Sequence, residues 1–234
     1  MHRCHEEDFT LAYNFVTLKP ALPRRYRTTM LFNSYGYIFL FLPVVLVVYF
    51  LLSRQRFTIG AKAWLFFASL VFYAWWNPIY TPLIAGSTVF NYIVGRQISK
   101  QREKGRFSRG RRLLIIGVLG NLALLGYFKY TDFFIANIDA IGHFRLSLLQ
   151  IVLPLGISFF TFTQIAFLVD TERGKVKEYS ALNYGLFVTF FPHLLAGPII
   201  HHSEMMPQFD RLRNKVANYR NMASGICLFF IGLF

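Results

Sequence analysis

The sequence predicts an all-α, polytopic helical integral membrane protein, and two observations lead to this fold class. The first is composition, because 55% of the 234 residues are apolar and only 15% are charged, well below the share usual for soluble domains. The second is the segregation of charge, since uncharged stretches cover residues 31–53, 63–95, 113–128, 146–169, 179–203 and 221–234. This segregation excludes a soluble globular protein, a disordered chain and a fibrous repeat, because each needs charges spread along its exposed surface.

The uncharged stretches fit helices rather than the strands of a membrane barrel. Barrel strands alternate apolar and polar residues over roughly ten positions, whereas residues 37–52 are apolar on every face. A helix satisfies its backbone hydrogen bonds within its own segment, which hydrocarbon surroundings require. The predicted partner of these surfaces is therefore a lipid bilayer.

The N-terminal 29 residues differ from the rest of the chain. Residues 1–29 mix both signs of charge, and they lack the apolar core and small-residue cleavage site of a signal peptide. We expect them to form a disordered extension that precedes a single membrane domain over residues 30–234. Within that domain, residues 31–53 are long enough to cross a hydrocarbon core of about 30 Å and form the first predicted span.

Residues 63–95 are too long for one ordinary crossing, and prolines at positions 78 and 82 interrupt them. Proline breaks a helix interior, so we predict helices over residues 63–76 and 82–95, joined by a turn at 77–81. Two crossings place the basic segments 54–62 and 96–112 on one side of the membrane. The second segment carries Arg96, Lys100, Arg102, Lys104, Arg106, Arg109, Arg111 and Arg112 against Glu103 alone.

Positive charge beside membrane spans marks the cytoplasmic side. We therefore assign both basic segments to the cytoplasm, and this explains the net charge of +14 without nucleic acid as a partner. Residues 113–128 should then cross outward and residues 129–145 should lie as an amphipathic segment at the outer surface. Residues 146–169 should cross back, although they contain Pro154 and Gly156.

Residues 179–203 are uncharged but unlike a plain membrane helix after Phe191. The residues that interrupt the pattern are Pro192, His193, Gly197, Pro198, His201 and His202. Irregular backbone at membrane depth is tolerated only where protein or water surrounds it. The pattern therefore predicts a helix followed by a broken or re-entrant segment that lines a cavity.

No signature of a soluble enzyme is present, since dinucleotide, phosphate-loop, hydrolase and zinc-protease motifs are all absent from the sequence. His193, His201 and His202 lack a carboxylate or thiol at the spacing of a zinc site, so we predict no metal. A structural role is the simplest interpretation of these histidines, and lining a substrate path is the alternative. Transporters commonly place ionisable residues inside their spans, and here only histidines occupy such positions.

Several blocks follow one another in order between residues 30 and 234: MLFNSYGYIFLFLPVV, FYAWWNPIY, NYIVGRQI, YFKYTDFF, LPLGISFFTFTQIAFLVDTERG, FFPHLLAGPIIHHSEMMPQF and GICLFFIGLF. Together they resemble the membrane-bound O-acyltransferase (MBOAT) family, and most closely its alginate O-acetyltransferase branch. The resemblance implies that residues 30–234 are the N-terminal part of a truncated MBOAT-type helix bundle.

The resemblance also implies an enzyme of the bacterial inner membrane that works with partner proteins for polysaccharide acetylation. Such an enzyme passes an acyl group, usually acetyl, from a cytoplasmic-side donor to a hydroxyl of an extracytoplasmic polysaccharide such as alginate. The expected donor is acetyl-CoA or a carrier thioester, with no bound cofactor. The alternatives that remain open are a non-catalytic membrane scaffold fragment and a small-solute transporter.

In the family a histidine of an Arg-Trp-His motif acts as general base toward the acceptor hydroxyl. This sequence contains no Arg-Trp-His, so the resemblance implies no catalytic residue within it, and the chain alone is expected to be inactive. The candidate residues of a substrate funnel are His193, Gly197, Pro198, His201 and His202.

Overall fold

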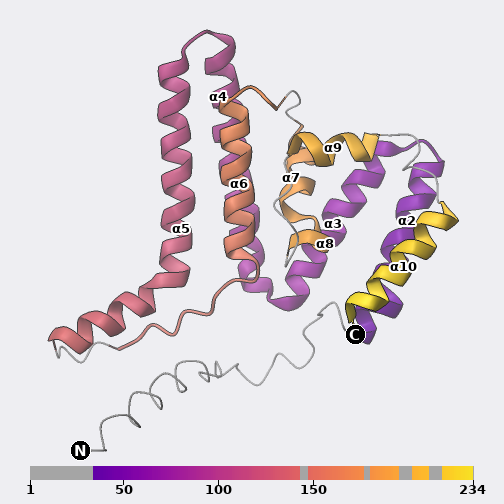
Figure 1. The fold of residues 1–234 in the computed structure, drawn as a ribbon, viewed down its shortest axis with the longest axis horizontal. Helices are drawn as coiled ribbons and strands as arrows, with labels where there is room; N and C mark the ends of the chain where they lie inside the picture. Colours follow the sequence, from indigo (N-terminus) through magenta and orange to yellow (C-terminus); the bar gives the residue numbers. More distant parts are fainter. Residues whose placement is uncertain (1–33, 143–146, 177–179, 195–201, 211–217, 234) are drawn as a thin grey trace, which may run out of the picture.

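The computed structural model describes residues 34–142, 147–176, 180–194, 202–210 and 218–233, and no strand occurs within those ranges. The predicted extension, residues 1–29, lies outside them. In chain order the elements are a π-helical turn η1 (Tyr37–Phe41), α2 (Leu42–Arg54), α3 (Thr58–Trp76), a 3₁₀ turn η2 (Pro78–Tyr80), α4 (Thr81–Glu103), α5 (Phe107–Gly142), α6 (Ile157–Glu172), α7 (Ala181–Thr189), α8 (Phe191–Leu194), α9 (His202–Asp210) and α10 (Tyr219–Leu233) (Figure 1). The all-α prediction is confirmed.

Within the described ranges, three helical stretches are long and apolar enough to cross a membrane, as judged by length and composition alone. They are Tyr37–Arg54, Thr58–Trp76 and Phe107–Gly142. The first corresponds to the predicted span over residues 31–53. The structure therefore agrees with a helical membrane protein.

The predicted break between α3 and α4 is confirmed. α3 ends at Trp76, and the side chain of Asn77 accepts a hydrogen bond from the backbone N–H of Ile79 at 3.0 Å, which starts the η2 turn. Both helices are longer than predicted, because they extend at their far ends into the basic segments. Most of residues 96–112 is consequently helix, and only a short turn separates α4 from α5.

α5 runs without interruption through the predicted span and the predicted amphipathic segment. Figure 1 shows that the helix bends toward its C-terminal end. The hydroxyl of Thr131 donates a hydrogen bond to the carbonyl of Tyr127 at 2.6 Å, and such bonds to the preceding turn often bend helices. The bend directs the last part of α5 away from the bundle.

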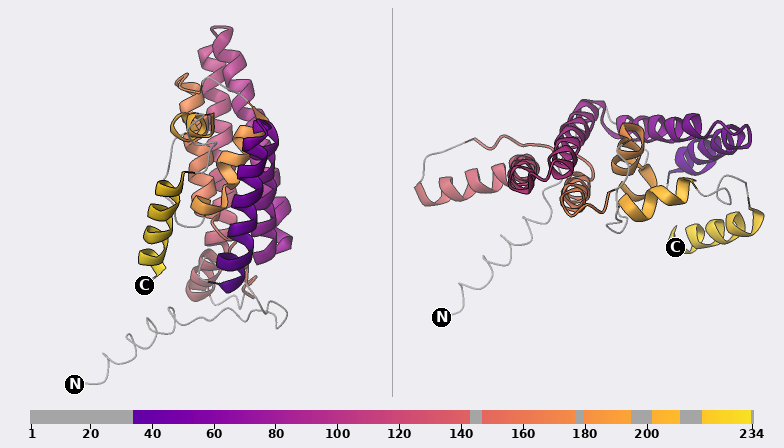
Figure 2. Two further views of the ribbon diagram at one scale, coloured as in Figure 1. Left: turned by 90° about the vertical axis from the view of Figure 1, so that its right-hand side faces the viewer. Right: turned by 90° about the horizontal axis from the view of Figure 1, so that it is seen from above.

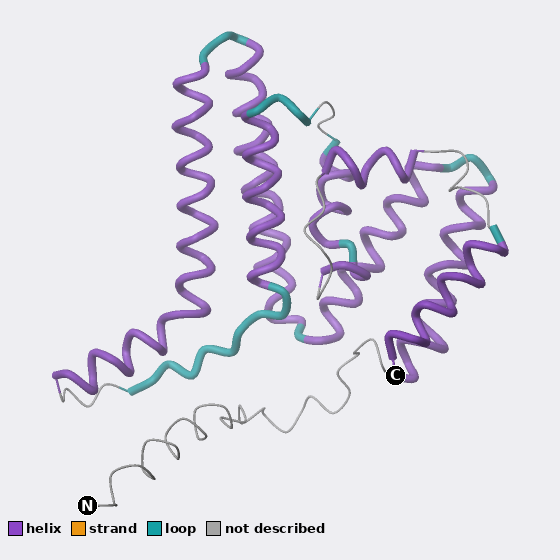
Figure 3. The backbone as a smooth tube through the Cα atoms, viewed as in Figure 1, coloured by secondary structure: helices purple, strands orange, loops and turns teal. Residues whose placement is uncertain are grey.

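The prediction of a helix over residues 146–169 is wrong in its first part. Residues 147–156 form no helix, and α6 begins only at Ile157 (Figure 3). The carboxylate of Asp132 accepts hydrogen bonds from the backbone N–H groups of Leu149 and Ile151, each at 2.9 Å. The hydroxyl of Tyr80 donates to the carbonyl of Val152 at 2.8 Å. These distant partners replace the backbone bonds that a helix would have made.

Two hydrophobic cores lie on either side of α7. The first core is formed mainly by α4, α5 and α6, and it includes Tyr184 and Phe187 of α7. The second core is formed by η1, α2 and α3, and it includes Leu186 of α7. The short helix α7 therefore joins the two halves of the molecule, as Figure 2 shows from two further directions.

A cluster of amide side chains links α4, α5 and α6 inside the first half. Asn91 Nδ2 donates to Asn121 Oδ1 at 3.1 Å, and Asn121 Nδ2 donates back to Asn91 Oδ1 at 2.6 Å. Asn91 Nδ2 also donates to Gln164 Oε1, which accepts a second bond from Ser87 at 2.9 Å. The three amide side chains are almost completely buried. We call this set the amide clasp, and its hydrogen bonds fix how the three helices align.

Replacement of Asn121 by leucine should destabilise the protein. Asn121→Leu removes both bonds to Asn91 and leaves the buried Oδ1 of Asn91 without the Asn121 donor, which costs about 1–3 kcal/mol. Unfolding in mixed detergent micelles, followed by circular dichroism, measures this loss. The control is Asn137→Leu, because Asn137 is an exposed amide of α5 that bonds only to its own helix. An equal loss of stability in both variants would contradict a specific role of the amide clasp.

Candidate functional site

The candidate site is the broken segment formed by α7, α8 and α9. α7 begins after Ser180, whose side chain accepts a hydrogen bond from the backbone N–H of Asn183 at 3.4 Å, a usual N-terminal cap. The helix ends at Thr189 because Pro192 follows, and a proline has no N–H and clashes with the preceding turn. The predicted break after Phe191 is thus confirmed, although the helix ends two residues earlier than expected.

The backbone at this break finds its partner on another helix. The N–H of Phe191 donates to the hydroxyl of Ser69 at 3.3 Å, and that hydroxyl donates to the carbonyl of Leu65 at 2.8 Å. The ring of Phe191 packs against Phe41 and Phe72, with centroid distances of 5.3 and 5.7 Å. α3 therefore supplies the hydrogen bond and one aromatic contact that hold the start of α8, and η1 supplies the other aromatic contact.

His193 lies in α8 and is 7% exposed. Its Nδ1 lies 2.8 Å from the carbonyl oxygen of Phe190, and only a protonated nitrogen can donate to a carbonyl. In the neutral imidazole, Nε2 therefore carries a lone pair, and this buried atom has no hydrogen-bond partner within the described parts of the chain. Edge contacts with Phe159 and Phe190, at 5.5 and 5.7 Å between ring centroids, hold the ring.

His202 begins α9, outside the three candidate membrane-spanning helices, and is also buried. Its ring makes edge contacts with Phe167 of α6 at 5.5 Å and Phe187 of α7 at 5.2 Å. Burial lowers the pKa of this imidazole to about 4, and the nearby Asp170 carboxylate acts in the opposite direction. His202 is accordingly neutral at physiological pH, as an aromatic packing partner requires.

The two histidines contact opposite ends of α6. His193 contacts Phe159, near the start of that helix, whereas His202 contacts Phe167, eight residues later. At 1.5 Å per residue these levels differ by about 12 Å. α7 and α8 thus run along α6 toward its first residues, whereas α9 lies nearer to its last residues (Figure 1). This is the course of a re-entrant segment, as the sequence predicts.

The position of the basic residues indicates which end of α6 faces the cytoplasm. Arg102, in the last turn of α4, donates to the backbone carbonyl of Glu172 at the end of α6. With the basic segments assigned to the cytoplasm, α6 ends on the cytoplasmic side and begins on the outer side. His193 then lies toward the outer side and His202 toward the cytoplasm.

The structure does not bring all the predicted site residues together. His193 and His202 belong to the same broken segment but lie at different levels along α6. Gly197, Pro198 and His201 lie outside the described residues. Within the described ranges, no group of histidine, cysteine, aspartate or glutamate side chains could hold a metal ion. Sequence reasoning missed the amide clasp, whose signal is that Asn91, Asn121 and Gln164 are amides in otherwise apolar stretches.

The fold and this segment define a class, that of helical membrane proteins with an interrupted helix buried in the bundle. Comparison with known proteins gives the family. The model of the MBOAT, membrane-bound O-acyltransferase family, matches residues 143–234, which include the whole broken segment.

Characterised relatives agree with this match. A peptidoglycan O-acetyltransferase of Helicobacter pylori is 45% identical, over 88% of this chain and 43% of the relative. A Pseudomonas aeruginosa protein described as "Probable alginate O-acetylase AlgI" is 38% identical, over 81% of this chain and 36% of the relative. A teichoic acid D-alanyltransferase of Lacticaseibacillus rhamnosus is 24% identical, over 55% of this chain and 29% of the relative. No solved structure matches the chain.

The chain belongs to the membrane-bound O-acyltransferase family. It spans less than half of the length of the curated relatives that it matches. The resemblance that the sequence motifs indicate is confirmed, and so is the prediction of an integral protein of the bacterial inner membrane.

Gly156 should be essential for the junction between α6 and the broken segment. Its φ is +68°, and an added Cβ would lie 2.7 Å from the backbone oxygen of Leu194. Gly156→Ala should therefore cost about 1–3 kcal/mol and lower the temperature at which the detergent-solubilised protein loses its monodisperse size-exclusion peak. The control is Gly126→Ala, because no atom lies within 4 Å of the added Cβ there. If the two variants lost the monodisperse peak at the same temperature, the close approach of Gly156 to Leu194 would be contradicted.

Proposed function

We propose that this chain forms part of an O-acyltransferase that passes an acetyl group to a hydroxyl of an extracytoplasmic polysaccharide. The observation that carries the proposal is the broken segment α7–α8, which lies buried inside a bundle of membrane helices. Irregular backbone in such a place favours a cavity lined by protein. Membership of the family supports the type of reaction.

The proposed reaction has two sides. The donor, acetyl-CoA or a carrier thioester, approaches from the cytoplasm, where the basic ends of α4 and α5 lie. The acceptor approaches from the outer side. The hydroxyl loses its proton to a general base, its oxygen attacks the acyl carbonyl, and the thiolate leaves. We place that base outside this chain, in the Arg-Trp-His motif that the family resemblance implies.

Alginate and peptidoglycan are the two acceptors that the names of the relatives suggest. Both are polysaccharides with hydroxyl groups outside the cytoplasmic membrane. We propose an acceptor of this class for the present protein, and partner proteins that deliver the polymer to the outer side.

His193 is the residue of this chain that we propose to contact the acceptor. Its Nε2 carries a lone pair and has no hydrogen-bond partner among the residues that the structure describes, and its ring packs on Phe159 near the start of α6. The ring cannot turn to find another donor, because the Phe190 carbonyl and two aromatic rings hold it. We propose that an acceptor hydroxyl donates to Nε2, so that His193 is a positioning residue and not the base.

Acetyl transfer should require the full-length reading frame that contains this chain. Membrane vesicles with the full-length protein should transfer labelled acetyl from acetyl-CoA to alginate or to peptidoglycan strands, measured by radioactivity bound to the polymer. The 234-residue chain alone should transfer none, because the general base is missing. The proposed function would be refuted if the full-length protein transferred acetyl to neither polymer, whether the donor is acetyl-CoA or a carrier thioester.

His193→Phe in the full-length protein should raise the KM for the acceptor by about threefold to tenfold with little change in kcat. Loss of one hydrogen bond made equally in ground and transition states has this effect. His193→Gln should restore the KM, because its Oε1 can accept in place of Nε2. The control is Thr161→Val, which removes an equally buried and unpartnered polar atom of α6 two residues from Phe159. A fall in kcat alone, or an equal defect in His193→Gln, would contradict this role.

A further inference from the structure

The short helix α7 is wedged between two helices that diverge. α3 and α4 separate from the η2 turn and have few contacts with each other, whereas both pack closely on α7 (Figures 1 and 2). α9 also packs on α7. α7 fills only part of the space between α3 and α4.

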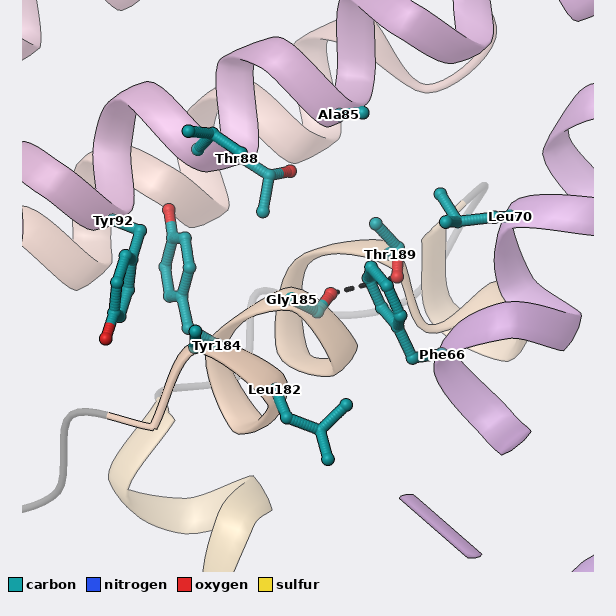
Figure 4. Close-up of a pocket in the computed structure, with 11 residues that line it drawn as sticks. Phe66, Leu70, Ala85, Thr88, Tyr92, Leu182, Tyr184, Gly185 and Thr189 are labelled. Atoms are coloured by element: carbon teal, nitrogen blue, oxygen red, sulfur yellow. Dashed lines mark hydrogen bonds between the residues drawn. The ribbon is translucent and has the colours of Figure 1, made fainter. Parts of the chain in front are cut away.

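A groove of about 310 Å³ remains where α3, α4 and α7 meet (Figure 4). Phe66 and Leu70 line it from α3, and Ala85 from α4. Its floor is α7, where Gly185 approaches α3 so closely that an added Cβ would lie 2.8 Å from the Phe66 ring. The small side chain of Ala85 leaves the groove open, and the lack of a side chain at Gly185 lets α7 approach α3.

The lining of the groove is almost entirely apolar, and the hydroxyls of its two threonines are already bonded. The hydroxyl of Thr88 donates to the carbonyl of Ile84 at 2.7 Å. The hydroxyl of Thr189 donates to the carbonyl of Gly185 at 2.9 Å, the bond drawn in Figure 4. The hydroxyl of Tyr184 is sealed from the surface, so only its ring can form part of the wall. An occupant of the groove must therefore be apolar.

The depth and size of the groove decide which apolar group fits. Phe66 and Leu70 lie at the middle of α3, a candidate membrane-spanning helix, so the groove opens where hydrocarbon surrounds the protein. A helix is about 10 Å wide and rises 1.5 Å per residue, so each of its residues fills roughly 100 Å³. The groove could hold only a fraction of one helical turn, whereas it can hold part of a single flexible chain.

We propose that this groove binds one acyl chain of a membrane phospholipid, which packs against the outer face of α7. The chain fills the wedge between α3 and α4 and supports the helix that leads into the broken segment. The proposal does not depend on acyl transfer, because it rests on the shape, the chemistry and the depth of the groove.

Photo-crosslinking tests the proposal. The 234-residue chain is reconstituted in phosphatidylethanolamine and phosphatidylglycerol vesicles that contain a phospholipid with a diazirine in the middle of one acyl chain. After illumination, mass spectrometry maps the lipid adducts. We expect adducts enriched at Leu70 and Leu182, two residues that line the groove, over those on the lipid-facing side of α5.

Filling the groove should abolish this enrichment. Ala85→Phe places a ring in the groove, and Ala181→Leu is a second, smaller filling substitution at another lining residue. The control is Ala123→Phe, which adds the same ring to an exposed position of α5 and should leave the enrichment unchanged. Adducts spread evenly over the exposed helices, no adducts at Leu70 and Leu182, or unchanged enrichment in both filled variants would each overturn the proposal.

Discussion

The structure depends on one constraint, that backbone N–H and C=O groups in hydrocarbon must find partners within the protein. α7 ends inside the molecule, too short to cross a bilayer, so its end must be covered from several sides. α3 supplies the hydroxyl of Ser69 to the freed N–H of Phe191, and α4, α6 and α9 cover the other faces of α7. The divergence of α3 and α4 follows from this requirement, because a parallel pair would leave no room for α7.

The features that the sequence predicts correctly have local causes. Charge segregation defines the helices, and Pro78 and Pro192 end helices because proline removes a donor wherever it occurs. The break at α7 could therefore be placed within two residues. The family could be recognised because its motifs are continuous in the sequence, and one matched region, residues 143–234, includes the broken segment.

The features that sequence reasoning missed depend on residues far apart in the chain. Residues 147–156 are apolar enough for a span, but Asp132 and Tyr80 hold their backbone in a non-helical conformation. The amide clasp likewise joins Asn91 to Asn121 and Gln164, 30 and 73 positions further on. No local pattern specifies such pairs. Within the candidate site, the separation of His193 from His202 also follows from packing on α6, not from their spacing in the sequence.

The broken segment places side chains at two levels of the bundle. A continuous helix would satisfy its own backbone hydrogen bonds and would run in one direction along the bundle. The interruption at Phe190 instead places His193 of α8 beside Phe159, near the start of α6, whereas His202 of α9 lies beside Phe167, nearer the end of α6 that bonds to Arg102. One short segment thereby reaches both levels of the bundle. In the reaction that we propose, the donor and the acceptor would approach these two levels from opposite ends of the bundle.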